Sequence, residues 1–310
     1  MTTLDLVVRS IDDSVPGVRS LTLAHADGAV LPSFTPGSHI VVECGAVANA
    51  YSLTGDSLQP TQYEISVLEQ PDGAGGSRWI HALAVGDPVS VLPPRSAFAP
   101  ILRARRHLLI AAGIGVTPMV SHLRSAKQWG REVDVMYLHK PGRGAHLGDI
   151  EALTDGARIF TQRSDFLGAL PITLASQPFG AHLYVCGPST FIDDVVAAAV
   201  EHGWPSSRIH FERFGVGALD PGEPFLVRLA NSGSSIEVDS GVSLLEALEA
   251  HGHEVPNLCR QGVCGECRLT VSAGDVEHRD MYLTDADKAA GDAIMACVSR
   301  AAAGELELKL

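Results

Sequence analysis

The chain has 310 residues, of which 45% are hydrophobic and 19% are charged, and this composition is that of a globular protein with two or three domains. Its formal net charge of −13 argues against binding to nucleic acid or to an anionic membrane surface. No apolar run is long enough to cross a membrane, and the N-terminal segment MTTLDLVVRSIDD lacks the basic and apolar regions of a secretory signal.

Residues 3–102 consist of short alternating strands that are interrupted by Gly and Pro. The strand segments are predicted at residues 4–11, 18–25, 38–45, 63–70 and 87–94. Several short strands at close spacing are typical of a small antiparallel barrel. On one of its strands Tyr51 could lie against an aromatic ligand, and the Ser52 hydroxyl could bond to a ring nitrogen. A Tyr-Ser pair on a barrel strand is, however, far more often an ordinary half-buried position.

A glycine-rich turn at residues 73–77 leads into an amphipathic segment. Ser77 is predicted to be the helix N-cap. Because backbone N–H groups at a helix start attract anions, a phosphate could lie at Gly75, Gly76 and Ser77. The alternative is a plain flexible turn before a capped helix, and such turns are common.

Between residues 103 and 215 strands and helices alternate, which predicts a parallel sheet of the α/β type. Strands are expected at residues 107–112, 133–139, 158–162, 182–186 and 208–211. Ligands of such sheets bind outside the carboxyl ends of the strands, so the residues that follow each strand are the candidates for a binding site.

The first of these strands is followed by the motif G-x-G-x-x-P, in which Gly113 and Gly115 let the backbone approach a pyrophosphate. Thr117 is predicted to be the N-cap of the next helix, with Pro118 at its first position. Cys186 ends a later strand before a Gly-Pro turn. It is either a small buried residue or a residue that faces a cofactor, and the sequence favours neither interpretation.

Residues 216–224 have the glycines and prolines of a linker. Beyond them, residues 225–229 and 236–238 predict a hairpin, Ser243 and Glu246 form a capping box at a helix start, and residues 306–310 predict a last strand. A mixed sheet with one helix packed across it, an α+β domain, is the natural interpretation.

The most specific motif of the chain is a set of four cysteines, three in C-x4-C-x2-C spacing and one far downstream. They are Cys259, Cys264, Cys267 and Cys297. This is the ligand pattern of plant-type [2Fe–2S] clusters. A structural zinc site is the alternative, but it usually presents two C-x2-C pairs, and a thioredoxin-like pair lacks its strand-then-helix context. The other two cysteines, Cys44 and Cys186, show no pairing logic, so we expect a reducing, cytoplasmic setting.

Six motifs together resemble the phthalate dioxygenase reductase family, which includes the vanillate demethylase reductase subunits. They are AYSL at 50–53, GGSRW at 75–79, GIGVTPM at 113–119, CGP at 186–188, ERF at 212–214 and the cysteine set. The resemblance covers the whole chain. It implies a flavin-binding antiparallel β-barrel at residues 1–102, an NAD(P)-binding domain at 103–215, a linker at 216–224 and a β-grasp ferredoxin domain at 225–310.

The resemblance also implies the cofactors and their contacts. FMN is expected between barrel and nucleotide domain, with Tyr51 packed on the isoalloxazine, Ser52 near N5 and the 75–77 turn on the phosphate. The other cofactor contacts that it implies are Leu53, Gly113, Gly115, Thr117, Pro118, Gly187, Pro188 and Phe214, with Cys186 near the nicotinamide. The family usually has Arg where this chain has Asn49, which leaves FAD as an alternative to FMN.

By the same resemblance the function is hydride transfer from NADH to the flavin, followed by single-electron transfer through the cluster to an oxygenase protein. The expected acceptor is a Rieske-type aromatic oxygenase or demethylase, with a cytochrome P450 as the alternative. A non-enzymatic redox-sensing module is the alternative from another class. NADPH stays open because Lys140 and Arg143 follow a strand where a 2′-phosphate could bind. We expect a monomer.

Overall fold

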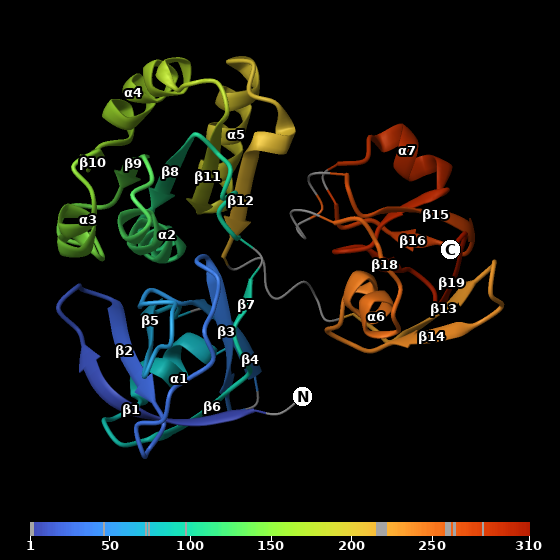
Figure 1. Cartoon of the computed structure of the whole chain (residues 1–310), viewed down its shortest axis with the longest axis horizontal. Helices are drawn as coiled ribbons and strands as arrows, with labels where there is room; N and C mark the ends of the chain where they lie inside the picture. Colours follow the sequence, from blue (N-terminus) through green and yellow to red (C-terminus); the bar gives the residue numbers. More distant parts are fainter. Residues whose placement is uncertain are drawn as a thin grey trace. The chain divides into compact units, whose positions relative to one another are not determined.

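The structure is a computed structural model that describes residues 3–45, 47–71, 73, 75–96, 98–214, 222–257, 262, 265–280 and 282–310. The chain divides into two compact units, Met1–Phe214 and Gly215–Leu310, and Figure 1 shows the elements of each. Within the described ranges no helix is long and apolar enough to cross a membrane.

The first unit begins with an antiparallel sheet that is nearly closed into a barrel. Its strands are β1 (Leu4–Asp12), β2 (Val18–Ala24), β3 (Ser38–Cys44), β4 (Val47–Ser52), β5 (Tyr63–Leu68), β6 (Pro88–Val91) and β7 (Arg95–Ser96). They follow the order β4-β3-β6-β1-β2-β5, with β7 beside β3. A bridge between Leu53 and Ile65 returns the end of β4 to β5. The predicted barrel is confirmed, but β4 and β7 lie outside the five predicted segments.

Strand alternation produces the core of the barrel. Inward residues of β3, such as Ile40 and Val42, are fully buried, whereas residues between them are partly or fully exposed. The helix α1 (Gly76–Ala82) packs Ile80 into the same core. The strand β4 carries few strongly apolar residues, which is why periodicity did not reveal it; its pairing with β3 defines it.

A parallel sheet completes the first unit, as predicted. It consists of β8 (Arg106–Ala112), β9 (Val133–Leu138), β10 (Ala157–Phe160), β11 (Ala181–Gly187) and β12 (Ile209–Arg213). Its order is β10-β9-β8-β11-β12, so the chain reverses direction across the sheet between β8 and β11. The helices are α2 (Thr117–Gln128), α3 (Leu147–Leu153), α4 (Arg163–Ser176) and α5 (Ser189–Glu201), with short turns η1 (Gly113–Val116) and η2 (Ser206–Arg208). Such a reversal is where ligands of open α/β sheets bind.

Helix α2 joins the parallel sheet to the barrel. The backbone N–H of Gly37, at the entry to β3, donates to Ser121 Oγ at 2.8 Å, and Nε of Arg124 donates to the carbonyl oxygen of Thr54 at 2.8 Å. An added Cβ on Gly37 would lie 2.6 Å from Nε2 of His122. The barrel and the sheet are therefore in close contact along this helix.

A cluster of four histidines lies beside Tyr184 of the parallel sheet; His107 and His122 are buried, and His182 and His210 are partly buried. His182 Nδ1 and His210 Nε2 are 2.9 Å apart, the His210 ring stacks on Tyr184, and the rings of His107 and His122 contact Tyr184 edge-on. Burial lowers the pKa of His122 and His210 to about 3 and that of His182 to about 4. These rings therefore remain neutral near pH 7.

The second unit is a mixed sheet with helix α6 (Leu244–Ala250) packed on it, as predicted. Its strands are β13 (Phe225–Leu229), β14 (Ser235–Val238), β15 (Arg268–Ala273), β17 (Ala293–Met295) and β19 (Glu305–Leu308), in the order β14-β13-β19-β15-β17. A small pair, β16 (Val276–Glu277) and β18 (Arg300–Ala301), and helix α7 (Asp285–Ala290) complete it. The hairpin is confirmed. So is the capping box, since Ser243 Oγ accepts from the Glu246 N–H and the Glu246 carboxylate accepts from the Ser243 N–H.

Candidate functional site

The Tyr-Ser-Leu segment lies at the end of β4, and the strand register decides where each side chain points. Tyr51 is opposite Ile40 and is half-buried, with its phenol beside the Cys44 thiol. Burial, and next to it the neighbouring thiol, raises the pKa of Tyr51 above its usual range. Ser52, on the other face, is opposite His39 and only 6% exposed. Leu53 is fully buried in the barrel core.

The glycine-rich turn before α1 differs from the prediction in its capping. Gly75 is the N-cap, with a left-handed φ of 108°, which favours glycine. Ser77 lies inside the helix, and its Oγ accepts a hydrogen bond from the N–H of Gln70 at 3.0 Å. The prediction of Ser77 as N-cap was therefore wrong, because the hydroxyl closes the preceding loop.

Asn49 and Gly76 are in direct contact. An added Cβ on Gly76 would lie 2.5 Å from Oδ1 of Asn49, so the Asn49 side chain fills the space beside the helix start. Arg78 lies on the same turn, with NH2 3.8 Å from the position of a Cβ on Gly75. Asn49, which stands where the family usually has Arg, and the 75–77 turn, which was predicted for a phosphate, are thus brought together by β4 and α1.

The turn after β8 lies against the end of β11. An added Cβ on Gly115 would be 2.4 Å from the carbonyl oxygen of Cys186 and 2.6 Å from the backbone nitrogen of Gly187, so only glycine fits there. Gly113 has a φ of 54° and no neighbour within 4 Å of an added Cβ. One glycine thus lets two strand ends meet, and the other permits the turn.

Thr117 is not the N-cap of α2, as the sequence suggested. The η1 turn precedes it, Val116 is the cap residue, and Thr117 Oγ1 donates to the carbonyl oxygen of Ile114 at 3.0 Å. Pro118 lies in the first turn of α2, where its missing N–H costs no hydrogen bond. The 3-10 turn η1 therefore leads directly into α2, without a capping side chain at the helix start.

Cys186 is fully buried and packs in the core between the sheet and α2. Its partner across the strands is Glu212, one residue of the ERF motif whose side chain sequence reasoning did not single out. Burial raises the pKa of Glu212 to about 8, and Oε2 of Glu212 has no hydrogen-bond partner among the described residues. Burial, then the Glu212 carboxyl, raises the pKa of the Cys186 thiol. The buried Oε2 at the carboxyl end of β12 marks Glu212 as a candidate site residue, and nothing in the sequence indicates that burial.

The other predicted contacts gather at the same edge. Gly187 ends β11, Pro188 is the N-cap of α5, and Phe214 follows β12 and packs partly against the core under α2. Glycine turns, the Cys186–Glu212 pair and Phe214 therefore surround the carboxyl ends of β8, β11 and β12, where a dinucleotide fits the fold.

Two of the four predicted cluster cysteines, Cys267 and Cys297, are described and both are buried. The backbone N–H of Gly262 donates to Sγ of Cys297 at 3.2 Å. Gly262 has a φ of 71°, and an added Cβ would lie 2.5 Å from Val298, so the loop needs glycine there. An N–H···S bond of this kind stabilises a thiolate that carries a metal cluster. Cys259 and Cys264 lie outside the described residues.

The buried carboxyl group of Asp280 belongs to a residue that lies beside Gly262. Asp280 Oδ2 accepts from the Leu283 N–H at 2.9 Å, and its Oδ1 accepts from Ser299 Oγ at 3.1 Å. An added Cβ on Gly262 would lie 3.0 Å from Asp280. Asp280 therefore fixes the segment before α7 against the segment that carries Cys297.

Two further histidines have backbone hydrogen-bond partners. His81 Nε2 bonds with the Val67 carbonyl, and His139 Nδ1 bonds with the Lys140 carbonyl, each at 2.9 Å. His39 lies opposite Ser52. In the part of the chain that the structure describes, no three His, Cys, Asp or Glu side chains converge as a metal site.

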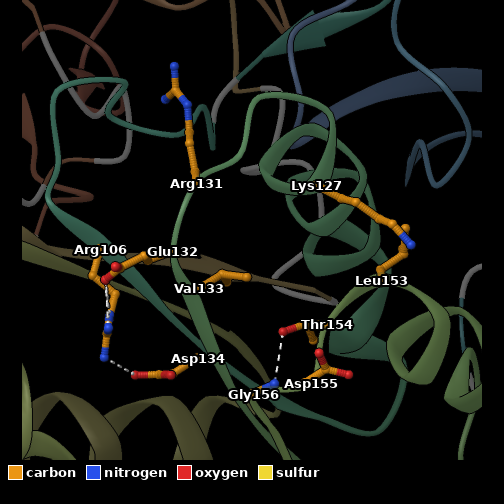
Figure 2. Close-up of a pocket in the computed structure, with 10 residues that line it drawn as sticks. All are labelled: Arg106, Lys127, Arg131, Glu132, Val133, Asp134, Leu153, Thr154, Asp155 and Gly156. Atoms are coloured by element: carbon orange, nitrogen blue, oxygen red, sulfur yellow. Dashed lines mark hydrogen bonds and ion pairs between the residues drawn. The ribbon is translucent and has the colours of Figure 1, made fainter.

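A separate cavity has a volume of about 360 Å³. Figure 2 shows residues that line it, among them the ion pair Arg106–Glu132, Lys127, Arg131 and Asp134. It lies at the amino ends of β8 and β9, at the opposite edge from Gly113 and Cys186. Because parallel sheets bind ligands at their carboxyl ends, this cavity is not the candidate site.

Two sequence families match parts of the chain. The family described as "2Fe-2S iron-sulfur cluster binding domain" matches residues 227–302. The family described as "Dimethylamine monooxygenase subunit DmmA-like, N-terminal domain" matches residues 89–209.

Individual relatives match the whole chain. The heme-dependent oxidative N-demethylase beta subunit of Ectopseudomonas mendocina (strain ymp) is 38% identical over 315 residues, which is 100% of this chain and 99% of that protein. A solved structure of phthalate dioxygenase reductase has a TM-score of 0.64 with 34% identity, over 99% of this chain and 98% of that one. An intact type IV self-sufficient cytochrome P450 monooxygenase has a TM-score of 0.70 with 33% identity, over 99% of this chain but only 41% of that longer chain.

Proposed function

Because this chain belongs to the phthalate dioxygenase reductase family, we propose that it passes electrons from NADH, through FMN and a [2Fe–2S] cluster, to an oxygenase component. The observation that carries the proposal is the close approach of Gly115 to Cys186. There the turn at residues 113–117, which we call the dinucleotide turn, meets the Cys186–Glu212 pair in the same unit as the antiparallel barrel. In the same chain a [2Fe–2S] domain follows. A hydride acceptor and a one-electron carrier in one polypeptide suit a reductase.

We propose Cys259, Cys264, Cys267 and Cys297 as the cluster ligands. The spacing of the set and the Gly262 N–H that points at Cys297 Sγ support this assignment. The buried Asp280 network keeps the Cys297 segment in place. The chain would then divide into the barrel at 1–102, the nucleotide domain at 103–215, the linker at 216–224 and the ferredoxin domain at 225–310.

The barrel residues are proposed to hold the flavin. A bound flavin accepts a hydride and gives up single electrons, which joins the two-electron donor to the one-electron cluster. Tyr51 offers a half-exposed ring, and Ser52 offers a hydroxyl on the opposite face of β4. Asn49 with Gly75 and Gly76 would receive the phosphate through neutral amide and backbone N–H groups, in place of the arginine usual in the family.

The parallel sheet is proposed to hold NADH. Gly113 and Gly115 allow the pyrophosphate to approach the backbone, with Thr117, Pro118, Gly187 and Pro188 lining the same turns. Glu212 holds a proton up to about pH 8, so near neutral pH it can donate or accept a hydrogen bond with the nicotinamide carboxamide. Phe214 closes this edge.

For the acceptor we propose a Rieske-type aromatic oxygenase or demethylase. A haem-dependent oxygenase such as a cytochrome P450 is the second candidate, because a relative 38% identical over the full chain is a subunit of a heme-dependent N-demethylase. Mixing the reductase and NADH with a purified Rieske oxygenase or a cytochrome P450 separates the two. The productive partner is the one whose Rieske absorbance bleaches, or whose ferrous–CO band forms, at catalytic reductase concentration.

The test of the function is anaerobic reduction of the purified protein by NADH. We expect two-phase bleaching, of the flavin and then of the cluster, followed by steady reduction of cytochrome c. NADPH tested at equal concentration decides the coenzyme, and extraction of the flavin decides between FMN and FAD. A protein that binds NADH without turnover would instead be a redox-sensing module, and the reductase proposal would be wrong. We propose a reducing, cytoplasmic setting and a monomer, in keeping with the buried thiols of Cys44 and Cys186.

A further inference from the structure

A chain of polar side chains crosses from the barrel to the parallel sheet. Ser66 Oγ, on β5, is 2.9 Å from His146 Nε2, and His146 Nδ1 is 2.8 Å from Asp149 Oδ2. Asp149 Oδ1 accepts from Arg124 NH2 at 2.8 Å, and Arg124 Nε donates to the Thr54 carbonyl at 2.8 Å. The chain thus begins and ends on the barrel. We call these five residues the clasp.

The clasp has the order of a catalytic Ser-His-Asp set but cannot act as one. The Ser66 residue is 6% exposed, and its hydroxyl is 2.7 Å from Ser20 Oγ, so no substrate carbonyl can reach it. Its geometry instead holds two sheets together. Because the Ser20–Ser66 bond can run in either direction, His146 can accept from Ser66 without leaving a hydroxyl proton unpaired.

The backbone of His146 shows that the clasp is imposed by the fold. Within the described ranges only Gln59 and His146 are non-glycine residues with positive φ, and His146 has a φ of 58°. This conformation costs an L-residue free energy, and it persists where the surrounding contacts hold it. At His146 it directs the ring to the barrel from the start of α3.

The clasp lies between the two proposed cofactor segments. Thr54 follows Ser52 by two residues, and Arg124 is on α2, which begins at the dinucleotide turn. We propose that Arg124 and His146 are positioning residues that fix the flavin segment of the barrel relative to the dinucleotide turn, and so set the distance for hydride transfer. The inference rests on the proposed function. A displacement of about 1 Å between reacting groups can slow a reaction about 100-fold.

The test compares His146→Asn with the unmodified protein. Asn tolerates a positive φ but is too short to reach Ser66, so the backbone is kept and the clasp is opened. We expect flavin reduction by NADH, measured in a single turnover, to slow at least tenfold while the flavin potential is unchanged. Glu132→Gln is the control, because it removes the ion pair with Arg106 at the far edge of the sheet. We expect Glu132→Gln to leave the rate of flavin reduction unchanged.

A second readout needs no NADH. The Gly37 N–H bonds to Ser121 across the same interface, so its hydrogen exchange, followed in the peptide that contains Gly37, reports opening of the two sheets. We expect at least tenfold faster exchange in His146→Asn. Faster exchange with an unchanged reduction rate would make the clasp a structural tie alone and overturn the proposal, as would a slower rate with unchanged exchange.

A double-variant cycle separates the clasp from independent effects. Ser66→Ala combined with His146→Asn should slow reduction no more than His146→Asn alone, because both break the same link. If the double variant instead slowed reduction by the product of the two single-variant factors, the proposal would be contradicted. Arg124→Lys keeps a charge near Asp149 but loses the Nε bond to Thr54, and an intermediate rate is expected. If the unmodified protein is not reduced by NADH, the proposed function fails, and the Gly37 exchange still decides whether the clasp holds the interface.

Discussion

The carboxyl group of Glu212 lies across the strand pair from the thiol of Cys186, at the carboxyl ends of β12 and β11. Burial raises the pKa of both groups, and the Glu212 carboxyl further opposes ionisation of the Cys186 thiol because both groups become negative. A polar but uncharged pair is thereby kept at the edge where the dinucleotide is proposed to bind. In the proposed site this neutral pair would face the uncharged nicotinamide of NADH, which becomes positive only after it has lost its hydride.

The Glu212 carboxyl makes stability depend on pH. Its folded pKa, about 8, is above the ordinary 4.5, so the folded state binds the extra proton between these values and stability falls as pH rises from about 5 to 8. We expect Glu212→Gln to remove this decline, of about 1.4 kcal/mol per pH unit at most. Urea unfolding at pH 5, 6.5 and 8 measures it. Parallel pH profiles for the two proteins would show that Glu212 ionises normally.

The histidine cluster acts in the opposite direction. The folded pKa values of His122, His182 and His210 are below the ordinary 6.5, so the unfolded state binds more protons below that pH. Their contribution is complete above about pH 6.5 and is lost as pH falls toward 4. Between about pH 4 and 6.5 the slope of the unfolding free energy against pH reports how many protons are taken up on unfolding. We expect His210→Gln to lower that number by about one. His202→Gln, at an exposed position on the C-terminal end of α5, should leave the slope unchanged.

Replacement of Gly113 and of Gly115 by alanine should lower the unfolding free energy by different amounts. In Gly115→Ala the new Cβ would overlap backbone atoms of Cys186 and Gly187, which cannot move independently. We expect the unfolding free energy to fall by about 3 kcal/mol and NADH binding to be lost. Gly113→Ala meets open space and only the cost of a left-handed φ, about 1–2 kcal/mol. Denaturant unfolding compares them, and equal losses would mean that the close approach at Gly115 is absent.

The Gly262 N–H should influence the cluster. In Gly262→Ala the added Cβ would press on Val298, and the N–H···S bond to Cys297 would be lengthened. A hydrogen bond of about 0.5–1.5 kcal/mol corresponds to about 20–60 mV for one electron, so the midpoint potential should fall by this amount. EPR-monitored redox titration measures it. Gly291→Ala, with a similar φ of 67° in open space, is the matched control and should not shift the potential.

Features that short segments encode could be predicted from the amino-acid sequence alone. Cysteine spacing indicated the cluster, strand periodicity indicated a barrel followed by a parallel sheet, and Ser243 with Glu246 marked a helix start that the structure has. Each of these depends on residues a few positions apart, so local geometry and solvation are sufficient to reveal them.

Contacts between residues far apart in the chain could not be predicted from the sequence, because they depend on strand register and packing. The Glu212–Cys186 pair depends on the register of β11 and β12, and the link from Ser66 to His146 depends on how the barrel packs against the sheet. The capping predictions for Ser77 and Thr117 failed for the same reason. Each hydroxyl found a partner in a preceding loop or turn, Gln70 or Ile114, whose position follows from packing and not from a capping pattern.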